Sequence, residues 1–189
     1  NALLQNADLS DEDLSGVNLS GTNLLKVRFQ GTNLSGADLS ESVLKDVDFQ
    51  RANLANANLS GTELLQVDFR NANLSRTNLK NIQMQIVKFE NVSLKSAKFE
   101  TLQCVHGDFS GSDWSELRLE NLVLVNCILK GANFDRTVLQ TATLLDGKME
   151  GFRASEARWN DTTLSGCELE GALFSGAIFK TVRLLKCNM

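Results

Sequence analysis

The chain has 189 residues, and 42% of them are hydrophobic, which is enough for one continuous core. Its 19 basic and 23 acidic residues give a net charge of -4, and this balance argues against general nucleic-acid binding, which requires a basic stripe. No apolar run approaches the length of a membrane span, and no signal peptide is evident, so we expect a cytoplasmic protein.

The first residue is Asn1 rather than Met, which indicates a processed chain or a segment of a longer protein. From Leu4 onward, a large apolar residue occupies every fifth position. This series runs to Met189 without an insertion and has 38 positions: 22 Leu, nine Phe, three Met, two Trp, Cys104 and Ala154. A period of five fits neither an α-helix nor a flat strand, but it fits a short extended segment followed by a corner. Because so short a strand cannot bury a face alone, the pattern predicts stacked coils, that is, a solenoid.

Each five-residue segment has the same internal pattern. The residue two places before the centre is small or β-branched, and it points inward with the centre because strand side chains alternate. The residue between them points outward and is often Asn or Asp, and Ser and Gly follow the centre at the turn. Two outward columns are rich in Asn, and stacked amides there could hydrogen-bond along the rod: Asn33, Asn53 and Asn73, then Asn18, Asp38, Asn58 and Asn78.

A second period gives the number of segments in a coil. Val-x-Phe occurs at 27–29, 47–49, 67–69 and 87–89, and Phe109 continues the series. The spacing of 20 means that four segments close one square coil, so the chain makes about nine and a half coils, roughly 45 Å tall. We number the sides by their centres in steps of twenty: side one starts at Leu4, side two at Leu9, side three at Leu14 and side four at Leu19.

Three stretches resemble the motif of the pentapeptide-repeat family: Ala7-Asp8-Leu9-Ser10, Ala37-Asp38-Leu39-Ser40 and Ala72-Asn73-Leu74-Ser75. The resemblance covers the whole chain and implies an all-β fold, a right-handed quadrilateral β-helix. We expect one such domain over residues 1–189, without an interrupting loop and as a segment of a longer protein. The family is functionally mixed, so the resemblance implies much less about function.

Two centres are small, and both have a large neighbour that compensates. Cys104 is paired with Leu102 two residues earlier, and Ala154 is paired with Phe152, so the volume of each segment is conserved.

The four cysteines, Cys104, Cys127, Cys167 and Cys187, form no CxxC motif, and we expect four free thiols. A bridge between Cys167 and Cys187, which are vertical neighbours, is the alternative.

Three groups of residues could suggest chemistry. Cys104 and His106 are close in sequence, but Cys104 points inward and His106 outward at a corner, so they should not meet. The acidic cluster Asp11–Asp13 could bind calcium, although a solvated end of the rod explains it better, with Glu12 at an inward position of the first coil. A P-loop, an HExxH motif and a nucleophile elbow are all missing, so we expect no enzyme, cofactor, metal or small-molecule substrate.

The outer face of side one is the candidate interaction face, because apolar residues recur there at multiples of twenty and should form a strip. Lys45, Gln85 and Ser165 interrupt it. The candidate residues are Leu25, Val43, Leu65, Ile86, Val105, Val123, Val125, Leu145 and Leu185.

The sequence therefore predicts a rigid, non-catalytic scaffold. It would bind a protein partner or a flanking domain, or a second copy as a homodimer, without direct contact to nucleic acid. The alternative comes from the family resemblance, since some members resemble B-form DNA in size and charge and inhibit or protect type II topoisomerases. That mechanism needs dense acidic columns. On side two, Arg28 and Lys88 interrupt the acidic series.

Overall fold

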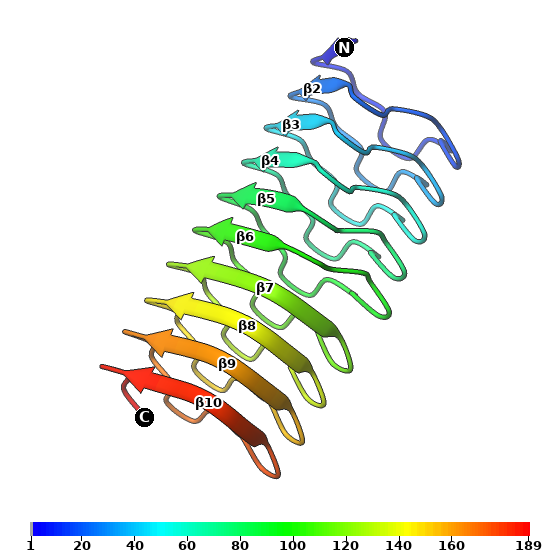
Figure 1. Cartoon of the computed structure of the whole chain (residues 1–189). Coiled ribbons are helices and arrows are strands. Elements are labelled where there is room, and N and C mark those ends of the chain that lie inside the picture. Colours follow the sequence, from blue (N-terminus) through cyan, green and yellow to red (C-terminus); the bar gives the residue numbers. More distant parts are fainter. Residues whose placement is uncertain (1) are drawn as a thin grey trace.

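A computed structural model describes residues 2–189 of the protein. It contains ten parallel strands, all following one another along a single rod (Figure 1). The strands are β1 (Leu3–Gln5), β2 (Asn23–Leu25), β3 (Val43–Lys45), β4 (Glu63–Leu65), β5 (Ile82–Gln85), β6 (Leu102–Val105), β7 (Arg118–Val125), β8 (Val138–Leu145), β9 (Arg158–Ser165) and β10 (Ile178–Leu185). The described residues include no helix that could span a membrane.

Successive strands pair in parallel with a constant offset of twenty residues, for example Leu4 with Leu24 and Leu124 with Leu144. Single-residue parallel bridges repeat this offset on the other sides, as between Asp8 and Arg28 on side two. The predicted four-sided β-solenoid is therefore confirmed, with no loop inserted between coils. A right-handed course is the one expected when parallel strands of one sheet are joined in sequence.

The corners recur at every fifth residue and have left-handed backbone conformation. From residue 6 to residue 186, every corner position except Thr101 has a positive φ, 25 of them non-glycine residues and 11 of them glycines. Asn, Asp and Gly tolerate this region well, whereas a β-branched residue such as Ile86, at φ 55°, rarely adopts it. The corner follows from the repeat rather than from glycine alone.

The outward Asn and Asp residues stabilise both the turn and the stack. Asn33 accepts a bond from the Ser35 amide at 3.2 Å, and its side chain donates to Asp13 at 3.0 Å. Asn53 and Asn73 continue this chain of amides upward, each donating to the residue one coil earlier at 3.1 Å. The predicted amide ladder is therefore present, and it explains why this position is polar on sides three and four.

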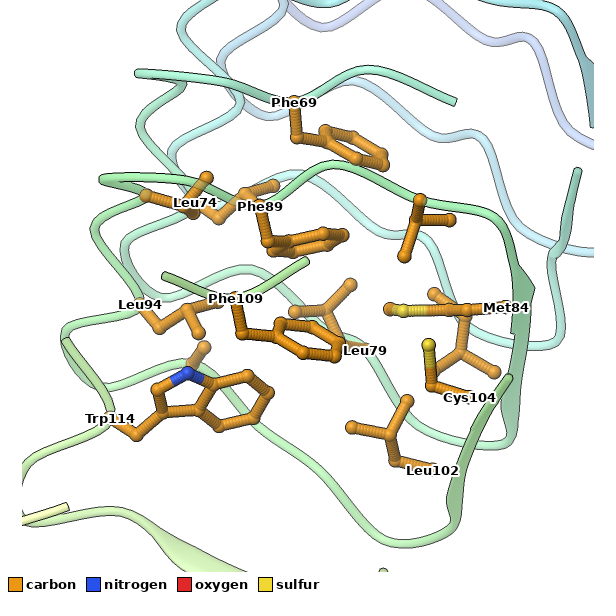
Figure 2. Close-up of a cluster of buried hydrophobic side chains, with 14 of the residues drawn as sticks. Phe69, Leu74, Leu79, Met84, Phe89, Leu94, Leu102, Cys104, Phe109 and Trp114 are labelled. Carbon is orange, nitrogen blue, oxygen red and sulfur yellow. The ribbon is translucent and has the colours of Figure 1, made fainter. Parts of the chain in front are cut away.

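Stacked aromatic rings fill much of the core (Figure 2). On side two, Phe29, Phe49, Phe69, Phe89 and Phe109 form one column with centroid separations of 4.8 to 5.4 Å. Ring offsets in this range are favourable for aromatic pairs. These side chains are fully buried.

Both predicted exchanges of large and small residues are confirmed. Leu102 and Cys104 are buried together, as are Phe152 and Ala154. Gly107 completes the first exchange, because a Cβ atom there would lie 2.5 Å from the Cys104 sulfur. The missing side chain leaves room for that thiol.

The two ends of the rod differ from its middle, since nothing stacks on them in the described chain. Inward residues of the last coil that would be buried elsewhere are exposed: Phe179 by 43%, Leu184 by 46% and Met189 by 84%. At the other end Glu12 is exposed, as expected for a solvated coil. Whether flanking sequence covers either end remains the prediction made above.

Candidate functional site

Most of the candidate residues lie in two columns on the outer face of side one. In the first column, strand pairing joins Leu25, Lys45, Leu65, Gln85, Val105, Val125, Leu145, Ser165 and Leu185 in that order. The second column lies one outward position earlier in each strand and contains Val43 and Val123. Because each neighbour is one strand away, the apolar residues form a strip along the rod.

The strip consists of an interrupted and a continuous part. Lys45 and Gln85 separate its apolar residues in the first coils, whereas Val105, Val125 and Leu145 are direct neighbours in β6, β7 and β8. Val105 is 36% exposed, while Val125 and Leu145 are half-buried, because neighbouring strands shield one another.

A shallow groove of about 420 Å³ lies on the interrupted part. Val43, Leu65 and Val105 contribute apolar walls, and the inward residues Leu64 and Met84 form part of its lining. The sequence analysis did not single out the polar residues of the groove, although their outward positions in the repeat identify them: Glu63, Gln83 and Gln103. Together with Lys45 and Gln85, these give the groove a mixed, amphipathic lining.

Ile86 lies apart from the flat face. It occupies the corner between sides one and two and is 45% exposed. With Gln66, Asp68 and Lys88 it lines a small separate hollow of about 180 Å³. It therefore extends the edge of the strip rather than its centre.

The other sequence candidates do not form a site. Cys104 is buried and His106 is exposed at its corner, so the two do not share a surface. Within residues 2–189, no group of three or more His, Cys, Asp or Glu side chains is arranged to hold a metal ion. The four cysteines are free thiols, and only Cys187 is less than fully buried. Burial raises the pKa of the Cys167 thiol, which favours its neutral form.

The family was tested by comparison with known proteins. The family model described as pentapeptide repeats matches eight copies, at residues 1–36, 26–61, 48–85, 108–140 and 149–189. The chain belongs to the pentapeptide-repeat family. No curated protein matches this chain.

Several solved pentapeptide-repeat structures are similar to this solenoid. Two trypsin-treated variants of QnrB1, a plasmid-mediated fluoroquinolone resistance protein, are 17% and 19% identical to it, with TM-scores of 0.72 and 0.61. The alignments cover 95% of this chain in both cases and 92% and 90% of QnrB1. A pentapeptide repeat protein from the Arabidopsis thaliana thylakoid lumen is 28% identical over 56% of this chain and 67% of its own, with a TM-score of 0.45. At these identities, the QnrB1 structures support the fold alone.

Proposed function

We propose that this protein is a rigid, non-catalytic scaffold that binds a protein partner or a flanking domain through the outer face of side one. The observation that supports this most directly is the unbroken apolar neighbourhood of Val105, Val123, Val125 and Leu145 on a sheet surface. Scattered apolar residues are normal on a surface, whereas a contiguous strip indicates an interaction site.

The shape of this face favours a macromolecule over a small ligand. Small-molecule sites are concave and enclose most of the ligand, whereas the side-one groove is shallow and open along the rod. The parallel ladder fixes the spacing of the strip, so a partner would meet a preformed surface with little ordering cost.

Inhibition or protection of a type II topoisomerase by mimicry of DNA is the second candidate. The overall similarity to QnrB1, a fluoroquinolone resistance protein, is the observation that favours it. The charges of side two argue against it, because Arg28 pairs with Asp8 and Arg70 pairs with Asp68 at 2.7 Å. A DNA gyrase supercoiling assay tests it: inhibition at low micromolar protein would support mimicry, and unchanged supercoiling would exclude it.

The scaffold proposal is tested by adding charge to the strip. In the triple variant Leu65→Asp, Val105→Asp and Val125→Asp, each new carboxylate points away from the core, so the fold should persist. The matched control is Ser35→Asp, Ser75→Asp and Ser155→Asp, which adds the same charge at the equivalent repeat position of side three.

Binding should respond only to the side-one variant. We expect it to lose self-association in analytical ultracentrifugation, or capture of a partner that co-purifies with the wild type, while the control retains both. Equal behaviour of the two variants would contradict the proposal. Circular dichroism establishes that both variants are folded.

A further inference from the structure

The main-chain ladder between coils has one interruption, on sides three and four. Elsewhere, amides at the centre and corner of each segment donate to the carbonyl nineteen residues later, as Leu74 does to Ser93 at 2.9 Å. Among residues 2–189, the corresponding bonds from Leu94, Ser96, Phe99 and Thr101 are absent. The bond from the Arg118 amide back to the preceding coil is absent too. All five would join residues 94–101 to residues 113–120.

We call the opening between these two segments the notch. Lys98 pairs with Asn78 in the preceding coil, and Arg118 pairs with Val138 in the following coil, but no bridge joins Lys98 to Arg118. A cavity of about 540 Å³, lined from both segments, lies at this place. Thr101, the one corner without a positive φ, ends the upper segment.

Three large side chains explain why the coils separate here. The rings of Phe99 and Trp114 stack across the two coils at 5.3 Å, and Trp114 lies beside Phe109 at the end of the phenylalanine column (Figure 2). Leu117 occupies an inward position that Ala97 and Thr137 hold in the neighbouring coils. Unlike the large residues Leu102 and Phe152, Leu117 has no small centre beside it, so the corner is overpacked.

The notch leaves main-chain donors and acceptors without their usual partners. The amides of Leu94, Ser96, Phe99 and Thr101 lack acceptors, and the carbonyls opposite them lack donors. Main-chain groups in folded proteins are almost always paired. Because donors and acceptors alternate along an extended chain, a second extended backbone is the partner that supplies both.

The charges around the notch are unbalanced. Glu100 is bound to Lys80 at 2.9 Å, and Glu116 is bound to Arg136 at 2.7 Å. In the described part of the chain, the rim cations Lys95, Lys98 and Arg118 make no ion pair, against the single unpaired carboxylate of Glu120. The free charge at the rim is therefore positive, which suits an acidic ligand.

We propose that the notch binds an extended acidic peptide segment of another protein. The peptide backbone would complete the interrupted ladder, and its carboxylates would pair with Lys98 and Arg118. The matched ranges of the family model leave out residues 86–107, which contain the upper rim, so the notch is a departure from the common repeat. This site lies on sides three and four, so its failure would leave the side-one proposal untouched.

Three labelled decapeptides test the proposal by fluorescence anisotropy with the full chain. The first alternates glutamate and threonine, the second alternates lysine and threonine, and the third is the glutamate peptide with methylated amides. Only the first should bind saturably, because the second has the wrong charge and the third lacks main-chain donors. Equal binding of the first and third peptides, or no binding of the first, would overturn the proposal.

Two variants locate the binding. Charge reversal by Lys98→Glu and Arg118→Glu should weaken binding of the glutamate peptide at least tenfold. The matched control, Arg51→Glu with Lys148→Glu, makes the same change in net charge at exposed cations elsewhere and should bind as the wild type does. Equal losses in both variants would show a non-specific effect of net charge and contradict the notch.

Leu117→Thr tests the cause of the opening. It installs the residue found one coil later, which should let the coils close, protect the Leu94 and Phe99 amides from hydrogen exchange and abolish peptide binding. Unchanged peptide binding in a folded Leu117→Thr variant with protected amides would overturn the proposal. If this variant does not fold, the charge-reversal pair still decides the question.

Discussion

At the scale of single residues, position in the repeat decides what a side chain does. Inward positions accept Cys as a small apolar residue, so Cys104, Cys127 and Cys167 are buried. Outward positions accept Asp and Asn interchangeably, since Asp38 and Asn58 both bind the serine amide two residues later, at 3.0 and 3.2 Å. Both patterns lead to measurable consequences.

The thiols should differ in reactivity. Cys187 is half-buried near the open end, whereas Cys104, Cys127 and Cys167 are buried, and burial raises the pKa of the Cys167 thiol. A thiol-reactive disulfide reagent should therefore modify Cys187 first in the native protein at pH 8. After denaturation without reductant it should find four thiols, and a count of two would reveal a Cys167–Cys187 bridge.

Acid should destabilise the fold through the outward aspartates. The Ser40 hydroxyl and then the Ser40 amide hold the pKa of Asp38 below its ordinary value, and the Ser15 amide does the same for Asp13. A lowered folded-state pKa contributes stability at neutral pH that is lost as pH falls through that pKa.

The double variant Asp13→Asn and Asp38→Asn keeps the accepting oxygens but removes the titration. Its melting temperature should therefore fall less between pH 7 and pH 3 than that of the wild type. An identical fall in both proteins would show that these carboxyl groups do not contribute to the acid sensitivity.

At the scale of elements, the strand lengths change half-way along the rod. The strands β1–β6 lie on side one alone, whereas β7–β10 continue around the corner from side four (Figure 1). In the first coils the Thr22 and Thr62 hydroxyls bind carbonyls three residues earlier, at 2.6 and 2.8 Å, and tighten this corner. Leu122 and Ala142 at the same position have no hydroxyl, and the chain there stays extended.

The phenylalanine column should hold adjacent coils together. Phe69 lies between two rings, at 5.1 Å from Phe49 and 4.8 Å from Phe89. Phe69→Ala should leave a cavity and lower the free energy of unfolding by about 3–5 kcal/mol. Urea denaturation measures this, with Arg76→Ala at an exposed corner as the control. A loss below about 1 kcal/mol would mean that the stack collapses into the gap.

The repeat made the sides, corners and core predictable, because a period of five allows only one inward register. The exchange of Leu102 for Cys104 was predictable for the same reason. The notch was not, because the period runs through Phe99 and Leu117 unchanged. Its cause is the combined volume of side chains in two different coils, which a repeat pattern does not add up. The groove glutamines were missed because attention fell on apolar residues alone.

At the scale of the whole molecule, the solenoid is a ruler that repeats each surface feature at the spacing of a β-sheet. Such a rod has no hinge between domains, so its function depends on what the four faces display. Side one displays an apolar strip, sides three and four display an amide ladder and the notch, and side two displays paired charges. These differences make side one the face on which the scaffold proposal depends.

The most direct test of that proposal is site-specific photo-crosslinking in cells that produce the protein. A benzophenone amino acid is placed at Val125 on side one or, as the control, at Ser75 in the equivalent repeat position of side three. The account predicts a discrete protein adduct from position 125, either with a partner or with a second copy, and none from position 75. Equal crosslinking from the two positions, or none from position 125, would contradict it.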